Sequence, residues 1–217
     1  MRLVIVGPPG AGKGTQAKLI CERYNIPHIS TGDMFRKNIS EGNEVGKAAQ
    51  KYINQGILVP DDIVNRMVKE RISQPDAKNG FLFDGYPRTV DQAEIFKALL
   101  SDQGFNLDAV FNLGISREKL IDRLTGRRIC EKCGASFNVI TNPSKVDGIC
   151  DYCGGNLTQR PDDNVEVTTK RVDVYMNETM PLIDYYRSAH ILYEINADGP
   201  IDRVFEDIRK VLEREVK

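Results

Sequence analysis

The stretch GPPGAGKGT, residues 7–15, decides the fold predicted for this chain. An apolar run at residues 2–6 comes directly before it, and a helical pattern begins directly after it at Gln16. A strand that ends in a glycine-rich turn, followed at once by a helix, is the arrangement that cradles phosphate groups. The glycines let several backbone N–H groups face one anion, and the helix N-terminus adds the positive end of its dipole. The stretch therefore predicts a phosphate site in which Lys13 supplies a full positive charge.

The position of the hydroxyl residue narrows the class of phosphate site. The usual Walker pattern has Ser or Thr directly after the lysine, whereas Gly14 here separates Lys13 from Thr15. This departure separates nucleotide-phosphate kinases from most GTPases and motor ATPases. A glycine-rich turn without a ligand is the alternative, and the strand, lysine and helix around the stretch argue against it.

Short β-branched runs alternate with helical patterns along the chain. Strands are predicted at residues 2–6, 26–29, 80–83, 109–114 and 191–195. Helices are predicted at residues 16–24, within 30–51, and at 61–72, 117–124, 165–186 and 201–215, and Thr89 is expected to cap one more. This alternation predicts an α/β protein with a five-stranded parallel sheet covered on both faces, whose ligands bind at the carboxyl ends of the strands.

Two stretches interrupt the alternation and look like insertions over the site. Residues 30–59 hold only helical patterns, and residues 126–163 hold four cysteines among many turn-forming residues. The predicted core domain therefore consists of residues 1–29, 60–125 and 164–217.

Charge and composition exclude several kinds of partner. Among 217 residues, 30 Lys and Arg face 31 Asp and Glu, so the net charge of −1 offers no general attraction to nucleic acid or to an anionic membrane. The chain starts with a strand rather than a targeting segment, and no apolar run approaches membrane-spanning length. We therefore expect a cytoplasmic protein. We also expect a monomer, because the sequence gives no sign of an apolar surface for self-association.

Cys130, Cys133, Cys150 and Cys153 follow the spacing Cys-x2-Cys-x16-Cys-x2-Cys of a zinc site. Four thiolates fill a tetrahedral shell and leave no position for water, so the predicted Zn²⁺ is structural. An iron centre and an air-formed disulfide are the alternatives. Zinc ribbons can also bind nucleic acid, but residues 126–163 carry five basic and five acidic residues, which is not a polyanion-binding surface.

Phosphoryl transfer needs positioning and charge neutralisation, so its sites are rich in Lys, Arg and Mg²⁺. Six arginines lie where predicted elements meet loops: Arg36, Arg88, Arg123, Arg127, Arg160 and Arg171. Each alone is more often a solvated surface residue, but their shared position beside the two insertions predicts a common site. Asp84 ends a strand where a metal-associated carboxylate is expected, and Asp33 starts a helix, so helix capping is its alternative role.

Four motifs together resemble the adenylate kinase family, in its zinc-containing bacterial form with a long lid. They are GPPGAGKGT at 7–15, HISTGDMFR at 28–36, FDGYPRTVDQ at 83–92, and LTGRRIC at 124–130 followed by the cysteine segment and QRPDD at 159–163. The resemblance covers essentially all 217 residues. It implies a P-loop NTPase-type sheet, a helical AMP-binding insertion at 30–59 and a zinc-binding lid at 126–163. It also implies reversible phosphoryl transfer from Mg·ATP to AMP, which gives two ADP.

The resemblance further implies roles for individual residues. Lys13, Arg127, Arg160 and Arg171 would neutralise the transferring phosphoryl group, with Mg²⁺ held through water near Asp33 and Asp84. The implied ATP contacts are Gly10, Ala11, Gly12, Lys13, Gly14, Thr15, Arg123, Arg127, Ser136, Phe137 and Gly199. The implied AMP contacts are Thr31, Arg36, Ile57, Leu58, Val59, Gly85, Tyr86, Pro87, Arg88, Gln92, Arg160 and Arg171. The side-chain amide of Gln92 donates and accepts at once, which matches the edge of adenine.

The chain departs from the family pattern at one pair of residues and at one proline. The lid usually carries Tyr-His where this chain has Phe137 and Asn138, so a tyrosine hydroxyl contact is missing, and Pro161 stands where a small flexible residue is more usual. Neither change removes a charge, so we expect effects on rate and affinity only. A kinase for another nucleoside monophosphate is the alternative function within this class. A regulatory P-loop NTPase whose zinc ribbon binds a macromolecule is the alternative outside it.

Overall fold

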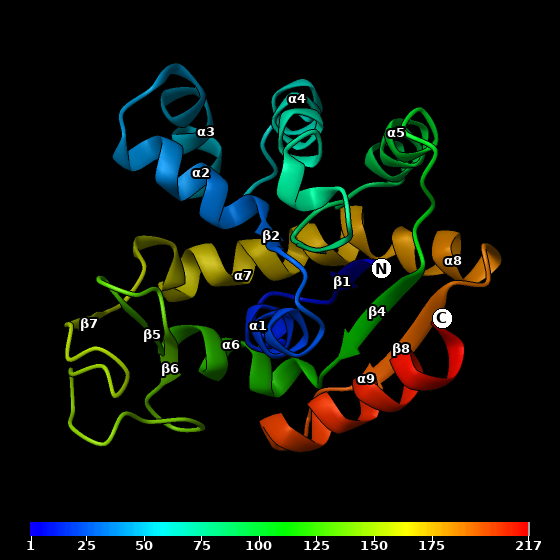
Figure 1. Cartoon of the computed structure of the whole chain (residues 1–217). Coiled ribbons are helices and arrows are strands. Elements are labelled where there is room, and N and C mark those ends of the chain that lie inside the picture. Colours follow the sequence, from blue (N-terminus) through cyan, green and yellow to red (C-terminus); the bar gives the residue numbers. More distant parts are fainter. Residues whose placement is uncertain (217) are drawn as a thin grey trace.

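The computed structural model describes residues 1–216, apart from the side chains of residues 117 and 118. Its centre is a five-stranded sheet in the order β2-β3-β1-β4-β8 (Figure 1). All neighbouring strands in this sheet run parallel, which confirms the predicted α/β fold. The strands are β1 (Arg2–Val6), β2 (His28–Ser30), β3 (Phe81–Asp84), β4 (Ala109–Gly114) and β8 (Leu192–Asn196).

Helices cover both faces of the sheet, because neighbouring residues of a strand point to opposite sides. On one face, Leu3 and Ile5 of β1 belong to an apolar cluster with side chains of α1 (Lys13–Tyr24) and α9 (Ile201–Glu215). On the other face, Val4 and Val6 belong to a second cluster. Its helices include α4 (Asp61–Ile72), α5 (Val90–Ser101) and α8 (Pro181–Ser188), and Phe35 and Ala49 from residues 31–54 also belong to it. None of the described helices combines the length and apolarity needed to cross a membrane.

Two segments extend beyond the sheet and its covering helices on the same side of the molecule (left in Figure 1). The first consists of the helices α2 (Thr31–Ser40) and α3 (Glu44–Asn54). The second, which we call the lid (residues 126–163), holds a small antiparallel sheet in the order β6-β5-β7. Its strands are β5 (Arg127–Cys130), β6 (Ser136–Asn138) and β7 (Leu157–Thr158). The helices α6 (Arg117–Thr125) and α7 (Val165–Val174) connect the lid to the core.

Some element boundaries differ from the prediction. The helix expected from Gln16 begins at Lys13, because the positive φ of Gly12 ends the turn one residue before it. The strands expected at residues 26–29, 80–83 and 191–195 begin one or two residues later than expected. The long helix expected at 165–186 is interrupted by a π-helical segment, Tyr175–Thr179, followed by Pro181. Proline has no backbone N–H to continue the helical hydrogen bonds, so α8 starts afresh there.

Candidate active site

The predicted phosphate-binding loop lies between β1 and α1. Gly7, Gly10 and Gly12 have φ values of 144°, 87° and 91°, a region that other residues rarely adopt. A Cβ at Gly7 would also lie 2.8 Å from the backbone oxygen of Leu113 in β4. The turn and its close approach to β4 therefore require glycine. The loop opens directly onto the N-terminus of α1, where free N–H groups and the helix dipole favour an anion.

Lys13 is the first residue of α1, and its ammonium lies at the mouth of the loop. It donates to the carbonyl oxygens of Gly7 at 2.7 Å and of Pro8 at 2.9 Å. Burial lowers the pKa of Lys13 to about 8, while the carboxylate of Asp84 acts in the opposite direction. The side chain thus offers a positive charge to any phosphate that the loop holds.

A large cleft extends from this loop to the lid. Its lining combines residues that lie far apart in the sequence, among them every residue for which an ATP contact was implied. These are Gly10, Ala11, Gly12, Lys13, Gly14, Thr15, Arg123, Arg127, Ser136, Phe137 and Gly199. Their contact with ATP stays a prediction, but the fold brings them around one space.

A smaller cavity lies where α2 meets the carboxyl end of β3. Its lining includes Thr31, Arg36, Ile57, Leu58, Val59, Gly85, Arg88, Gln92 and Arg171. Arg36, Arg88 and Arg171 line the large cleft as well. These three guanidinium groups therefore lie where the two spaces meet, which is the place where a group passing from one bound molecule to another would be.

Three residues with implied AMP contacts lie elsewhere. Pro87 and Arg160 line the large cleft rather than the smaller cavity. Tyr86 lines neither space, because its side chain is fully buried against Phe83 and Phe96. Its hydroxyl donates to Oδ1 of Asn65 at 2.7 Å. The side chain of Tyr86 is therefore part of the core, and only its backbone is available to a ligand.

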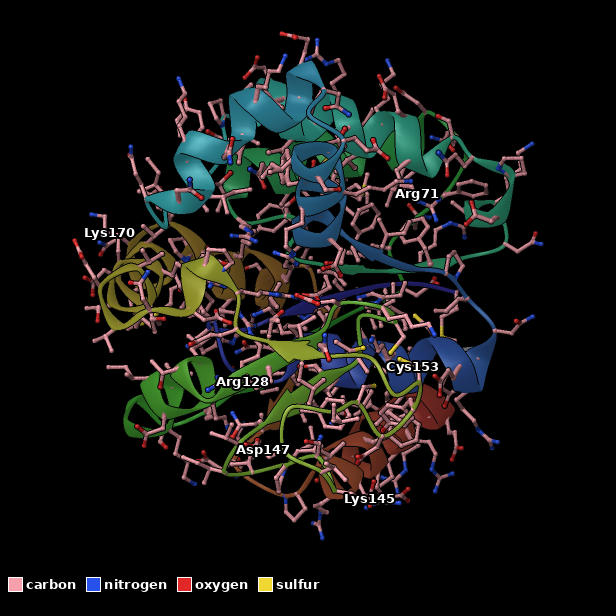
Figure 2. The ribbon with its side chains drawn as sticks, turned by 90° about the vertical axis from the view of Figure 1, so that its left-hand side faces the viewer. Arg71, Arg128, Lys145, Asp147, Cys153 and Lys170 are labelled. Carbon is pink, nitrogen blue, oxygen red and sulfur yellow. The ribbon has the colours of Figure 1, made fainter. Side chains whose placement is uncertain are left out.

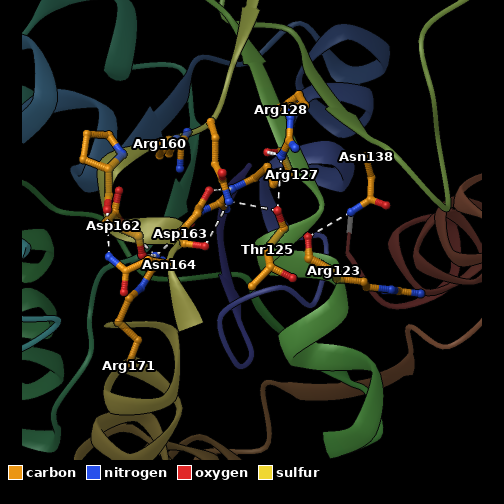
Figure 3. A network of polar contacts seen from close by, with 12 residues as sticks. Arg123, Thr125, Arg127, Arg128, Asn138, Arg160, Asp162, Asp163, Asn164 and Arg171 are labelled. Carbon is orange, nitrogen blue, oxygen red and sulfur yellow. Dashed lines mark hydrogen bonds and ion pairs between the residues drawn. The ribbon is translucent and has the colours of Figure 1, made fainter. Parts of the chain in front are cut away.

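The arginines of the lid and of α7 are held by two neighbouring carboxylates (Figure 3). Arg127 donates through Nε to Oδ2 of Asp163 at 2.7 Å and through Nη2 to Oδ1 of the same carboxylate. Arg171 donates through Nη1 to Oδ2 of Asp162 at 2.8 Å and to Oδ1 of Asp163 at 3.3 Å. Asp163 is completely buried. Buried charges of this kind need partners, so the two carboxylates fix where both guanidinium groups point.

Arg36 and Arg160 share a different carboxylate. Nη2 of Arg36 lies 2.5 Å and Nη2 of Arg160 lies 3.6 Å from Oδ1 of Asp33. Asp33 does not cap its helix. That position is taken by Ser30, whose hydroxyl accepts a hydrogen bond from the backbone N–H of Asp33. The capping alternative for Asp33 is therefore wrong.

Positive charge is concentrated in this site. Burial, together with the charge of Arg171, lowers the pKa of Arg88 to about 10. Burial, together with the charges of Arg36 and Arg127, lowers the pKa of Arg160 to about 10 as well. Both groups remain charged at neutral pH, so their mutual repulsion persists. A bound polyanion would relieve that repulsion, and the arrangement favours a ligand with several phosphate groups.

Asp84 ends β3 beside the phosphate-binding loop. A Cβ at Gly14 would lie 3.4 Å from Oδ2 of Asp84, and Nε2 of His28 lies 3.6 Å from the same oxygen. Although burial acts to raise it, the pKa of Asp84 is lowered by the His28 side chain and by the charge of Lys13. Asp33 and Asp84 both line the large cleft. Their carboxylate oxygens suit a hydrated Mg²⁺, which prefers oxygen ligands and keeps several of its waters.

The four lid cysteines come together as the spacing predicts. Their Sγ atoms all lie within 4.8 Å of one another. Two of the pairs, Cys130–Cys153 and Cys133–Cys150, are 3.4 Å and 3.6 Å apart, close to the separation of about 3.8 Å expected for tetrahedral Zn–S bonds of about 2.3 Å. Two matching turns present them: the N–H of Gly134 donates to the carbonyl of Cys130, and that of Gly154 donates to the carbonyl of Cys150, both at 2.9 Å. Figure 2 labels Cys153 among the lid side chains. The donor set fits Zn²⁺, and no disulfide joins these thiols.

The sequence analysis missed two kinds of site residue. Asp162 and Asp163 were noted only as acidic residues of the insertion and as part of the motif at 159–163, and no pairing with an arginine was predicted for them, although their place directly after Arg160 and Pro161 was a usable signal. Asn138 was noted only as a departure from a pattern. Its Nδ2 donates to the backbone oxygen of Arg123 at 2.9 Å, and its Oδ1 accepts from two N–H groups of the following turn. No local pattern indicates that link between the lid and α6.

The fold and these two adjoining spaces define a class of protein. A phosphate-binding loop, a lysine and a group of arginines between two cavities constitute the site of a P-loop nucleoside monophosphate kinase. A family model described as adenylate kinase matches residues 5–191. The chain belongs to the adenylate kinase family.

Relatives named adenylate kinase are similar to the chain over almost its whole length. The protein from Clostridioides difficile is 55% identical over 96% of each chain. The protein from Caldanaerobacter subterraneus subsp. tengcongensis is 53% identical over 98% of this chain and 96% of its own. The protein from Desulforudis audaxviator is 53% identical over 99% of this chain and 100% of its own.

Proposed function

We propose that this chain transfers the terminal phosphoryl group of Mg·ATP to AMP, reversibly, and so forms two ADP. The observation that carries the proposal is the position of Arg36, Arg88 and Arg171, which line both the large cleft and the smaller cavity. An ATPase or GTPase needs one nucleotide site beside its loop, whereas transfer between two nucleotides needs two sites that meet at a shared group of cations. ATP would occupy the large cleft and AMP the smaller cavity.

The transfer forms one bond and breaks another without moving a proton. A phosphate oxygen of AMP attacks the terminal phosphorus, and the bond from that phosphorus to the bridging oxygen of ATP breaks. The acceptor oxygen is already ionised at neutral pH, so no general base is required. Lys13, Arg127, Arg160 and Arg171 would neutralise the charge of the phosphoryl group in flight, as preorganised cations do in such transition states. Arg36 and Arg88 would hold the phosphate of AMP.

Water competes with AMP as the acceptor, and the two insertions would exclude it from the site. We assign residues 30–59 to an AMP-binding domain, residues 126–163 to the lid, and residues 1–29, 60–125 and 164–217 to the core. Arg127 belongs to the lid and Arg36 to the AMP-binding domain, so the full set of cations assembles only when both insertions close over their ligands. Closure of this kind also excludes water.

Two metal ions would support the activity in different ways. Bound with ATP near Asp33 and Asp84, Mg²⁺ would supply charge neutralisation on the phosphates. Zn²⁺ bound by the four lid cysteines would be structural, because four thiolates leave it no open position. The reduced thiols suit a reducing compartment, and we propose that the protein is cytoplasmic, monomeric and without nucleic-acid or membrane partners.

A phosphoryl-transfer assay tests the proposal directly. The purified protein is incubated with Mg·ATP and separately with AMP, CMP, UMP or GMP, and the products are followed by ³¹P NMR. We expect rapid formation of ADP with AMP alone. Preferred transfer to another acceptor would assign a sibling kinase, and release of phosphate without any acceptor would assign a regulatory NTPase. Both results would overturn the proposed activity.

A further inference from the structure

The backbone and the side-chain amide of Gln92 are both engaged within the protein, and only one N–H and one lone pair of the side chain remain free. Its backbone N–H donates to Oγ1 of Thr89 at 3.1 Å, and its backbone oxygen lies 3.2 Å from the hydroxyl of Tyr86. In its side chain, Oε1 accepts from the backbone N–H of Arg88 at 2.8 Å, and Nε2 donates to Oδ1 of Asp61 at 2.6 Å. The residue is 2% exposed and lines the smaller cavity. Its side chain therefore has a defined position in the wall of that cavity.

The two side-chain partners also define which end of the amide is which. A backbone N–H can only donate, so the atom next to Arg88 must be the oxygen of Gln92. A carboxylate can only accept, so the atom next to Asp61 must be the nitrogen. Turning the amide by 180° would bring its oxygen against the carboxylate of Asp61 and its N–H groups against the N–H of Arg88. Both contacts would be repulsive, so only one orientation of the amide is allowed.

The donor and acceptor positions that remain free show what the amide offers to a ligand. The amide nitrogen has two hydrogens and its oxygen has two lone pairs. Asp61 takes one hydrogen and the N–H of Arg88 takes one lone pair. One donor and one acceptor remain, in a fixed order along the amide edge. Adenine offers the complementary pair, an acceptor at N1 and a donor at its 6-amino group, whereas a 6-oxopurine offers a donor at N1 and an acceptor at O6.

We propose that Asp61 is a positioning residue that selects 6-aminopurine over 6-oxopurine acceptors by fixing the amide of Gln92. This inference rests on the proposed function, because it deepens the recognition of the AMP base in the smaller cavity. A free glutamine amide would turn to match either purine edge and would discriminate poorly between them. Asp61 opposes that turn through a charged hydrogen bond, which is stronger than a neutral one. Among the described residues that line the cavity Gln92 is present and Asp61 is not, so Asp61 acts through Gln92.

Asp61 also begins α4, where a carboxylate favours the positive end of the helix dipole. Asp62 occupies the same first turn, carries the same charge and is exposed. The two residues share the helix-terminus effect, but the bond to Gln92 comes from Asp61. Asp62→Asn is therefore a matched control for Asp61→Asn, since each variant removes one charge from the same helix terminus without changing side-chain size.

The test compares AMP with inosine monophosphate, which differs from AMP at N1 and at position 6 of the base. The values of kcat/KM for both acceptors are measured with Mg·ATP in the wild type, Asp61→Asn and Asp62→Asn, and the affinities for both monophosphates are measured by calorimetry. Asparagine can turn together with Gln92, whereas the N–H of Arg88 keeps its part of the constraint. We expect the AMP preference to fall about tenfold in Asp61→Asn, the size of one lost charged hydrogen bond, and to stay unchanged in Asp62→Asn.

Other outcomes overturn the inference. An unchanged ratio of AMP to inosine monophosphate in a folded Asp61→Asn protein would show that Asp61 has only a structural role, since lost stability affects both acceptors equally. An equal fall in both variants would assign the effect to the helix terminus. Asp61→Ser provides a second test of the same bond if Asp61→Asn does not fold. A wild type that binds AMP but transfers no phosphoryl group would overturn the proposed function, and the calorimetric ratio would still decide the role of Asp61.

Discussion

Arg127 and Asp163 lie 36 residues apart in sequence and form a two-point ion pair across the base of the lid, with Nε of Arg127 2.7 Å from Oδ2 of Asp163. The carboxylate is completely buried and also accepts from Arg171 at 3.3 Å. One carboxylate therefore joins the first lid strand, the end of the lid and α7. The arginines proposed for phosphoryl transfer thus also contribute to stability, and the predicted effects of their replacement differ from one to the next.

Replacement of Arg127 by alanine is expected to lower both stability and turnover. The change leaves the buried carboxylate of Asp163 without its two-point partner, and a broken buried pair costs about 3–5 kcal/mol. The change also removes a positive charge beside the phosphoryl group that is transferred, which should lower kcat at least about a hundredfold. Urea unfolding and steady-state kinetics measure the two effects. In the double variant Arg127→Ala/Asp163→Ala, part of the stability should return while activity does not, and simple additivity of the two changes would contradict this account.

Arg160→Ala is expected to lower turnover by a similar factor with almost no loss of stability. The partner of Arg160 is the exposed Asp33 at 3.6 Å, and pairs of that kind contribute less than about 1 kcal/mol. Comparison with Arg127→Ala thus separates catalysis from folding, since the two arginines line the same cleft. A melting temperature reduced as much as in Arg127→Ala would show that Arg160 is structural.

Lys13 is expected to make stability depend on pH in alkaline solution. Burial lowers its pKa in the folded protein from 10.5 to about 8. Between these values the unfolded chain keeps the proton that the folded protein has lost, so the free energy of unfolding rises with pH across this window. In Lys13→Met this contribution is absent. Urea unfolding of both proteins at about pH 7 and about pH 10 should show a larger gain for the wild type, and equal gains would contradict the burial of this charge.

Removal of metal from the lid is expected to lower thermal stability. The four thiols come from two turns of one insertion, so a shared ion adds a link between segments that are otherwise joined by the short β5–β7 pairing and a small apolar cluster. Cys153→Ser should lose the metal and lower the Tm by at least about 3 °C, roughly the effect of 1 kcal/mol in a chain of this size. Cys21→Ser, which changes the thiol outside this group, should keep its zinc. Elemental analysis and circular dichroism measure both, and an unchanged melting curve after verified loss of metal would contradict the link.

Asn138→Ala is expected to weaken ATP binding more than AMP binding. The side chain of Asn138 ties the lid to the backbone of Arg123, whose guanidinium donates to the oxygen of Ala197 in the cleft at 3.2 Å. Loss of these bonds should raise KM for ATP about three- to tenfold and leave KM for AMP within about twofold. Asn142→Ala is the control, because the hydrogen bonds described for Asn142 involve only its backbone. An equal rise in both KM values would point to general damage to the fold.

The core fold was predictable because its signals are local. A strand is indicated by a run of β-branched residues, and a helix is indicated by the period of its apolar residues. Both patterns can be recognised within a short stretch of sequence. The same holds for the loop at residues 7–15, whose glycines are needed for the turn itself. The break at Tyr175–Thr179 was not predicted, although Pro181 directly after it is a local signal for the end of a helix. The lid strands were not predicted, because strands of two to four residues are too short to show a periodic pattern.

The candidate site was predictable as a set of residues but not as a set of contacts. The spacing of the four cysteines indicated their cluster, and the positions of the arginines beside the insertions indicated a shared space. Neither pattern could show that Tyr86 is a core residue, nor that Ser30 rather than Asp33 caps α2. These outcomes depend on which side chains reach one another after the chain has folded.

The sequence by itself determined the parallel α/β core, the phosphate-binding loop and the four neighbouring thiols, because each follows from residues close together in the chain. Only the tertiary structure decided that Arg127 pairs with Asp163 and that Gln92 pairs with Asp61, 36 and 31 residues away respectively. A buried charge or amide takes whichever partner the packing of distant elements places within about 3 Å. No rule of spacing encodes that choice, so the sense of the Gln92 amide, and the purine it would select, is a property of the folded molecule.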